Sequence, residues 1–356
     1  MSGSLEAMRD FLIERQEDLA REIVERHWKL SPALEQRYGQ KGRARCLEDA
    51  RYHLRYLSES IGAGEPALFV HYATWAKTML LARGIAVEDL VANLEVMLEV
   101  LGKGLPASMQ IPAVDYLKSA IGSLTLASDS PSFLDRSQPL AELANQYLSA
   151  LLRYDRHSAS ALILAAVENK VSIKEIYSHV FERCQYEIGR LWQSNVVSIA
   201  QEHYCTASTQ LIMSQLYPYI FRAERIFRGT IVAACVSGEL HEIGARMLCD
   251  LLEMEGWMTI YLGANVPTAG IVDVLRHNHS NILAISASMT FHIRAVRDVI
   301  AAVRLASPTT TILVGGYAFK IAPNLWRNVG ADYWAKDASN AISLIVGLDD
   351  KMAKAR

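Results

Sequence analysis

A short loop between an apolar run and a helical pattern constrains this chain more than any other stretch. The uninterrupted apolar run Ile231 to Val236 predicts a buried strand, and a helical pattern begins near Ile243. Between them, Ser237 to Gly244 reads Ser-Gly-Glu-Leu-His-Glu-Ile-Gly. Parallel α/β sheets bind ligands at such strand-to-helix loops, so Glu239 and His241 are predicted to face a ligand. A neutral imidazole can ligate a metal, and a carboxylate two residues earlier can orient the ring.

Two further apolar runs end in small residues. Leu283 to Ala287 leads into Ser286-Ala287-Ser288, and Thr311 to Val314 leads into Gly315-Gly316. Glycines at a strand end let the backbone approach a bulky ligand closely. Strand and helix patterns alternate from Gly229 to Gly347, which predicts a doubly wound, Rossmann-like parallel sheet.

The pattern Glu239-x-His241-x-x-Gly244 resembles the cobalamin-binding signature, usually Asp-x-His-x-x-Gly, with Glu in place of Asp. A loop histidine that caps the following helix is the alternative. The serines and the glycine pair stand at matching spacing, where that family contacts the nucleotide tail of the cofactor. The resemblance implies that His241 displaces the nucleotide base and ligates cobalt from below. It implies further cofactor contacts at these positions: Glu239, Gly244, Ser286, Ser288, Gly315 and Gly316.

A second helical block precedes this domain. The capping box Ser172 to Glu175 opens a helix that runs to Trp192, and a second such sequence opens another helix at Ser198. With two earlier helices, the block from Leu140 to about Arg222 predicts a four-helix bundle. Poor helix formers interrupt it after Trp192, so Glu202 and His203 should lie on the first turns of the next helix. All three side chains can then converge on one ligand.

The spacing Trp192-x9-Glu202-His203 resembles the motif of adenosylcobalamin-dependent light-sensing regulators. There a four-helix bundle covers the upper face of the cobalamin, and these residue types surround the 5′-deoxyadenosyl group. A core tryptophan with a surface Glu-His pair is the alternative. Gln193 stands where those regulators can place a cobalt-ligating histidine, and an amide is a poorer cobalt ligand. We find no basic recognition helix, which argues against direct DNA binding.

The segment from Leu5 to Leu126 carries helical patterns almost throughout, with one helix expected to end at Gly102 and the last to start at Pro112. It predicts an all-helical, globin-like sensor domain. Aromatic and basic residues gather in its middle, where ordinary core packing is one interpretation. The other is a pocket for a flat, acidic chromophore whose propionates pair with arginine. The candidates for that pocket are Arg51, Tyr52, Arg55, Tyr56, His71 and Trp75.

The order of sensor-like helices, bundle and cobalamin domain resembles the photocobilins. That resemblance implies biliverdin as a second chromophore. Cys46 is then a candidate thioether site, although no motif supports a covalent bond and we expect none. Haem with His71 as axial ligand is the runner-up.

The 356 residues allow two or three domains. We predict a helical domain over residues 1–126, a linker over 127–139, the bundle over 140–226, the cobalamin domain over 227–349 and a tail over 350–356. The net charge of −2 creates no global attraction to nucleic acid or acidic membranes. Five scattered cysteines suit a reducing cytoplasm. The start does not read as a signal peptide, and no apolar run is long enough to span a bilayer.

We therefore expect a cytoplasmic light sensor that uses adenosylcobalamin, with biliverdin as second chromophore and no catalytic activity. Signalling is expected through light-dependent self-association and a downstream partner that the sequence does not name. The alternatives are a corrinoid methyl-carrier protein of a methyltransferase system and a haem-binding, globin-type sensor fused to a B12 domain. A mutase subunit would need a substrate barrel of roughly 250 residues, which this sequence does not contain.

Overall fold

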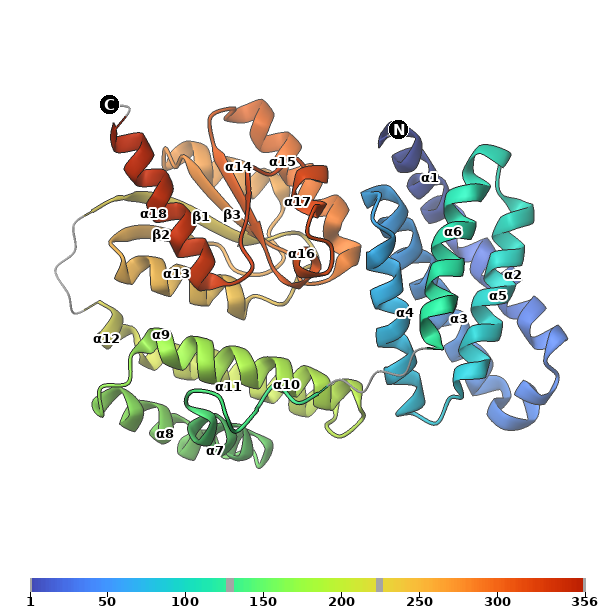
Figure 1. Ribbon diagram of the computed structural model, residues 1–356, viewed down its shortest axis with the longest axis horizontal. Coiled ribbons are helices and arrows are strands. Elements are labelled where there is room, and N and C mark those ends of the chain that lie inside the picture. The colour runs from blue at the N-terminus through green and yellow to red at the C-terminus, as the bar shows by residue number, and fades with distance from the viewer. Residues whose placement is uncertain (1, 126–130, 222–226, 355–356) are drawn as a thin grey trace. The chain divides into compact units, whose positions relative to one another are not determined.

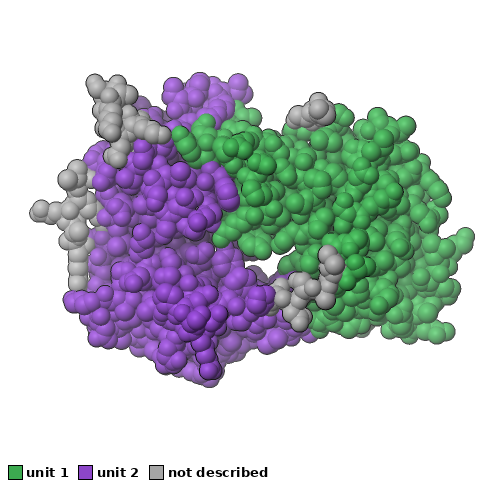
Figure 2. Space-filling view, viewed as in Figure 1, with its two compact units in different colours: residues 1–127, 287–302, 315–333 green, residues 128–286, 303–314, 334–356 purple. Residues whose placement is uncertain are grey.

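A computed structural model describes residues 2–125, 131–221 and 227–354 (Figure 1). Contacts divide the chain into two compact units, coloured separately in Figure 2. Unit 1 comprises Met1–Ala127, Ala287–Ala302 and Gly315–Tyr333, and unit 2 comprises Ser128–Ser286, Val303–Val314 and Trp334–Arg356. In the described part of the chain, no helix is both long enough and apolar enough to cross a membrane.

The N-terminal part of unit 1 is helical, as predicted. Its helices are α1 (Ser2–Glu14), α2 (Gln16–Leu30), α3 (Ala33–Ala63), α4 (Pro66–Leu81), α5 (Val87–Gly104) and α6 (Ala107–Leu124). Two predicted boundaries are wrong. Helix α5 continues past Gly102, because a helical glycine costs only about 1 kcal/mol and the next turn still buries Leu105. Pro112 lies inside α6, which begins directly after Pro106.

Unit 1 also contains segments that follow strands β3 (Ile282–Ser286) and β4 (Thr311–Gly315). These form the short helix η2 (Thr290–His292), the start of α15 (Ile293–Ala306), α16 (Tyr317–Ile321) and α17 (Leu325–Asn328). The Arg297 guanidinium donates to the Gly62 carbonyl at 2.6 Å and pairs with Glu6 at 3.1 Å. The buried Glu59 accepts from the Arg294 backbone N–H at 3.3 Å and from Arg9 at 2.7 Å. Helices α1 and α3 are therefore bound to the segment after β3 by partly buried polar contacts.

The predicted helix bundle forms the first part of unit 2. Its helices are α7 (Ala141–Leu152), α8 (Arg156–Glu168), α9 (Ile173–Ile176), the π-helical turn η1 (Tyr177–Phe181), α10 (Glu182–Gln193), α11 (Ile199–Gln215) and the short α12 (Tyr217–Ile220). The capping box at Ser172 and Glu175 is present. Helices α9, η1 and α10 follow without a break, so they count as one member of the bundle. Tyr147, Tyr177 and Phe181 fill its core and are almost completely buried.

The predicted parallel sheet is also present, with strand order β2-β1-β3-β4-β5. The strands are β1 (Gly229–Cys235), β2 (Trp257–Tyr261), β3 (Ile282–Ser286), β4 (Thr311–Gly315) and β5 (Tyr333–Trp334). Helices α13 (Ile243–Met254) and α18 (Ala338–Lys354) lie together on one face, and α14 (Thr268–His277) lies on the other (Figure 1). The order reverses between β1 and β3, whose ends at Cys235 and Ser286 are register partners. Ligands bind at such a switch point.

Three predicted segments include residues outside the described ranges. These residues are 127–130 of the predicted linker, 222–226 at the end of the predicted bundle, and 355 and 356 of the predicted tail. Helix α18 continues to Lys354, through most of the predicted tail.

Within unit 2, helix α13 is fixed to the bundle by polar contacts. The buried Tyr177 hydroxyl donates to Asp250 Oδ2 at 2.7 Å. The Arg246 guanidinium donates to the Gln210 carbonyl at 3.1 Å and to Ser214 Oγ at 2.7 Å. Burial raises the pKa of the Asp250 carboxyl to about 6.

The raised pKa of Asp250 predicts a pH-dependent stability. Its folded value, about 6, lies above the ordinary 3.8, so this group stabilises the fold below the unfolded pKa, and that contribution is lost as pH rises through 6. Asp250→Asn keeps an acceptor for Tyr177 and removes the charge. The free energy of unfolding of the variant, relative to wild type, should therefore increase by about 2 kcal/mol between roughly pH 4 and pH 7.

Urea unfolding across this pH range measures the difference. Asp273→Asn, at an exposed position on α14, is the matched control and should show no such trend. A difference between Asp250→Asn and wild type that stays constant with pH would contradict the assignment.

Candidate functional site

The Glu239–His241 pair has the geometry of an oriented metal ligand. Glu239 is completely buried, and its Oε1 accepts from the His241 backbone N–H at 2.9 Å and from the ring Nδ1 at 2.6 Å. With the Nδ1 proton held in this way, Nε2 is the ring atom that can offer a lone pair. The His241 side chain is 61% exposed. Buried carboxylates orient metal-ligating histidines in the same manner, so these residues fit a cobalt ligand.

The same hydrogen bond determines the electrostatics of the pair. It raises the pKa of His241, and partial burial of the ring opposes that shift. The nearby charges of Glu239 and Glu202 add to the increase in the pKa. Glu202 belongs to α11, and the same helix contacts the residue after His241 directly, because Gln210 donates to Glu242 at 2.7 Å.

Asn265 holds the turn that precedes the pair, and sequence reasoning missed it. Its Oδ1 accepts from the Gly238 N–H at 2.7 Å, and its own N–H donates to the Glu239 carbonyl at 2.9 Å. Gly238 has a φ of 82° and Asn265 a φ of 54°, which are left-handed conformations that glycine and asparagine tolerate best. The only sequence signal for this role was the presence of an asparagine, a residue that favours turns, in the loop after β2.

Glu242, directly after His241, was also missed. Its Oε1 accepts from Gln210 Nε2 at 2.7 Å, and its Oε2 accepts from the Tyr261 hydroxyl at 2.8 Å. The three residues come from α11, the start of α13 and strand β2. Their sequence separation left no local pattern from which to predict the contact.

The small residues of the predicted site have two different structural roles. A Cβ at Gly244 would meet no atom within 4 Å, so space next to the loop is open. Gly316 has a φ of 97°, and a Cβ there would lie 2.4 Å from the Ala287 carbonyl oxygen. Close approach within the chain therefore requires Gly316, a reason that sequence reasoning did not supply. Gly315 ends β4, and its carbonyl accepts from the Ala287 N–H at 3.1 Å.

The serines flank the end of β3. Ser286 is its last residue, and Ser288 follows two residues later. Both are partly buried.

The predicted break between Trp192 and Glu202 is present. Trp192 lies in the last turn of α10, and Ser198 caps α11 by accepting the Gln201 N–H. Glu202 and His203 therefore occupy the first turns of α11. Trp192 and Glu202 are partly buried, whereas the His203 side chain is 70% exposed. Gln193 is buried.

The structure brings together only part of the predicted chromophore pocket in unit 1. Tyr56 stacks on Tyr72 with ring centroids 3.7 Å apart, and Trp75 lies 6.3 Å from Tyr72. His71 Nε2 lies 3.3 Å from the Tyr317 hydroxyl, and burial lowers the pKa of His71. Tyr56 of α3 and Tyr72 and Trp75 of α4 form an aromatic cluster.

The basic residues proposed for the pocket are arranged differently. The Arg55 guanidinium lies 4.4 Å over the Phe291 ring, beside the aromatic cluster. Arg51 instead forms a two-point pair with Glu17 at 2.7 and 2.8 Å, and Tyr52 is 53% exposed. Burial raises the pKa of Cys46 to about 12, which opposes the thiolate character that a covalent attachment needs.

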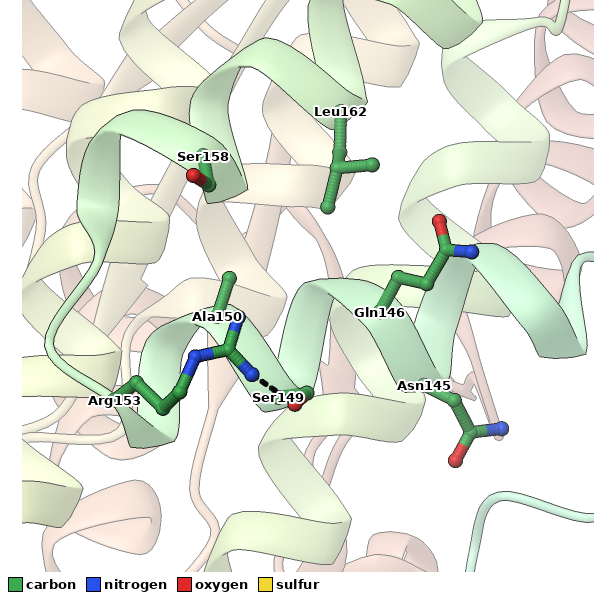
Figure 3. A pocket seen from close by; sticks show the side chains of 7 residues that line it. All are labelled: Asn145, Gln146, Ser149, Ala150, Arg153, Ser158 and Leu162. Carbon is green, nitrogen blue, oxygen red and sulfur yellow. Dashed lines mark hydrogen bonds between the residues drawn. The ribbon is translucent and has the colours of Figure 1, made fainter.

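A separate open groove lies on helices α7 and α8 of the bundle (Figure 3). Its volume is about 570 Å³. It is lined by Asn145, Gln146, Ser149, Ala150, Arg153, Ser158 and Leu162, none of which is a predicted site residue.

Comparisons with known proteins match the two domains that carry the site. Two models of a B12 binding domain match the chain, one over residues 229–343 and one over residues 143–217. Dimethylamine corrinoid protein 2 of Methanosarcina mazei is 30% identical over 183 residues, covering 51% of this chain and 77% of that protein. Dimethylamine corrinoid protein 1 of the same organism is 28% identical over 191 residues, covering 52% and 80%.

The structure of the Methanosarcina barkeri monomethylamine corrinoid protein has a TM-score of 0.52 at 18% identity, covering 59% of this chain and 99% of that one. That likeness shows a shared fold. The bundle, the sheet and the Glu239–His241 pair thus lie in segments that match B12 binding domains. The chain belongs to the family of cobalamin-binding corrinoid proteins.

Proposed function

We propose that this chain is a cobalamin-based light sensor that takes adenosylcobalamin between its bundle and the His241 loop. One observation carries the proposal. Helix α11 bears Glu202 and His203 in its first turns. Farther along the same helix, Gln210 donates to Glu242, the residue directly after His241, and accepts from Arg246 of α13. The helix that carries the predicted upper-face residues is thus held beside the predicted lower ligand.

Each residue has a defined task in this proposal. Bound adenosylcobalamin supplies a cobalt–carbon bond that green light breaks. Glu239 retains the Nδ1 proton of His241 and directs Nε2 toward cobalt. Trp192 offers a flat apolar face to the adenosyl group. Glu202 and His203 offer hydrogen-bonding groups beside it.

The additional helices favour a sensor over a simple carrier. Both B12 binding models leave residues 1–142 unmatched. In unit 1, helices α1 and α3 bind the segment after β3 through Glu59 and Arg297. That segment lies within the matched B12 binding domain, so we propose that a ligand of the N-terminal helices acts on the cobalamin domain through it.

We extend the proposal to biliverdin as a second chromophore. The aromatic cluster of Tyr56, Tyr72 and Trp75 supports stacking with a conjugated pigment. Of the two candidate arginines, we propose Arg55 as the partner of a propionate, because Arg51 already pairs with Glu17. Haem with His71 as axial ligand is the alternative occupant, and the absorption spectrum distinguishes the two.

The proposed output is a light-dependent change in association, with no catalysis by the chain itself. A void beside Trp192, such as departure of the adenosyl group would leave, would cost about 24 cal/mol per Å³. The bundle would therefore move to fill that space or admit water. A surface on the bundle that pairs two chains would change with it, which is a two-state response biased by one ligand.

A corrinoid methyl carrier is the second candidate function. The names of the relatives favour it, because they are corrinoid proteins whose names refer to dimethylamine. A carrier needs the bundle and the sheet domain alone. Preference for the adenosyl form therefore discriminates between the two functions.

His241→Ala should weaken cobalamin binding roughly 10- to 100-fold and abolish the absorption features of histidine-ligated cobalt. The loss of the lower ligand is the reason, since the nucleotide tail can still bind elsewhere. Spectroscopic titration measures both quantities. His277→Ala, an exposed histidine on α14, is the control. Unchanged affinity and spectrum in His241→Ala would refute the ligation.

Trp192→Ala and His203→Ala should retain cobalamin but lose selectivity for the adenosyl form over the methyl form by roughly tenfold, or about 1.4 kcal/mol. These residues are proposed to contact only the upper group. Equilibrium titration of each variant with adenosylcobalamin and methylcobalamin tests this, with His157→Ala on α8 as an exposed control. Equal affinity of the wild type for both forms would favour the carrier.

The dark, adenosylcobalamin-loaded protein should differ in oligomeric mass from the illuminated protein. Size exclusion with light scattering, before and after green light, measures the mass. Trp192→Ala should respond less, because it packs less tightly against the adenosyl group. Equal masses in both states would remove association as the output.

A further inference from the structure

Glu242 joins three elements next to the proposed cobalt ligand. It directly follows His241, and its carboxylate takes one hydrogen bond on each oxygen, from Gln210 at 2.7 Å and from Tyr261 at 2.8 Å. The Tyr261 hydroxyl also lies 3.3 Å from the Glu242 carbonyl oxygen. A Cβ on Gly263 would lie 3.2 Å from Oε2, so the chain after β2 packs closely on the carboxylate.

The Glu242 side chain is not used to cap its own helix. It stands at the N-cap position of α13 yet makes no side-chain capping hydrogen bond. Its carboxylate is directed instead to α11 and β2. A carboxylate placed only for helix capping would bond to the backbone N–H groups of the first turn.

Gln210 is held at both its side chain and its backbone. Its amide donates to Glu242, and its carbonyl accepts from Arg246 at 3.1 Å. Arg246 also donates to Ser214, one turn farther along α11. Helices α11 and α13 are therefore fixed together at this point.

The same helix extends to the proposed upper-face residues. Glu202 lies eight residues before Gln210 on α11, which is roughly 12 Å along a helix. Movement of the first turn of α11 therefore reaches Gln210 through a continuous helix. Gln210 transmits it to Glu242, the neighbour of His241 in the chain.

We infer that Gln210 and Glu242 are positioning residues whose hydrogen bond couples the group bound beside Glu202 to the hold of His241 on cobalt. The inference rests on the proposed function, because it needs His241 as the cobalt ligand. It names the contact through which the bundle acts on that ligand.

A swap of the two side chains tests the inference in the whole 356-residue chain loaded with adenosylcobalamin. Gln210→Glu places a second carboxylate against Glu242. It should lower the affinity for adenosylcobalamin about tenfold and reduce the absorption of histidine-ligated cobalt by a similar factor. The Gln210→Glu/Glu242→Gln double variant again pairs a donor with an acceptor and leaves an acceptor for Tyr261. It should recover both quantities to within about threefold of wild type.

Gln146→Glu is the matched control, because Gln146 donates to Glu142 at the same distance of 2.7 Å on an exposed face of α7. It should behave as wild type. Gln210→Ala removes the donor without adding charge and should show an intermediate loss, which provides a test if Gln210→Glu does not fold. Circular dichroism of each variant reports folding separately from the cobalt spectrum.

The outcomes separate the inference from the proposed function. A wild-type spectrum and affinity in Gln210→Glu and Gln210→Ala would overturn the inference while histidine ligation stands. A double variant as defective as Gln210→Glu would also overturn it, since the effect would then not depend on the paired contact. A wild-type protein without histidine-ligated absorption would overturn the proposed ligation, and the inference with it.

Discussion

The hydrogen bond between Glu239 and His241 is the interaction on which the proposed site depends. A buried carboxylate that loses its partner costs several kcal/mol, so the fold must keep a donor at that position. His241 supplies it with both its backbone N–H and its ring Nδ1. The exposed remainder of the ring is then limited to one orientation. The Nε2 lone pair is therefore oriented before a ligand binds, and no binding free energy is spent on ordering the His241 ring.

Several elements around that bond keep the loop in place. Asn265 fixes the turn before Glu239 from one side, and Glu242 is held by Gln210 and Tyr261 from the other. The loop is thus bound to the segment after β2 and to the bundle. A change in the bundle can therefore act on His241 without any contact to the imidazole itself.

The N-terminal helices are joined to the segment after β3 by polar contacts inside unit 1. Buried Glu59 and the largely shielded Arg297 pair with groups that belong to distant parts of the chain. Such groups are costly to separate, because each would lose its partner in a region with little water. The segment after β3 therefore folds together with α1 and α3. Ala287–Ala302 accordingly belongs to unit 1, although it lies within the segment that matches the B12 binding domain.

The sequence by itself determined the architecture, because that information is local. Apolar runs, caps and glycines predicted the three principal strands, the break before Ser198 and the helical N-terminal domain, and the Glu-x-His spacing placed the pair on one loop. The boundaries predicted at Gly102 and Pro112 were wrong, because burial of the helices outweighed the low helix propensity of glycine and proline in α5 and α6. Only the tertiary structure decided which partners those residues meet. Arg51 pairs with Glu17 and not with a group of the aromatic cluster. The Ala287 carbonyl leaves no room for a Cβ at Gly316, and Gln210 donates to Glu242. These contacts join residues far apart in the chain, and their geometry exists only after the core has packed.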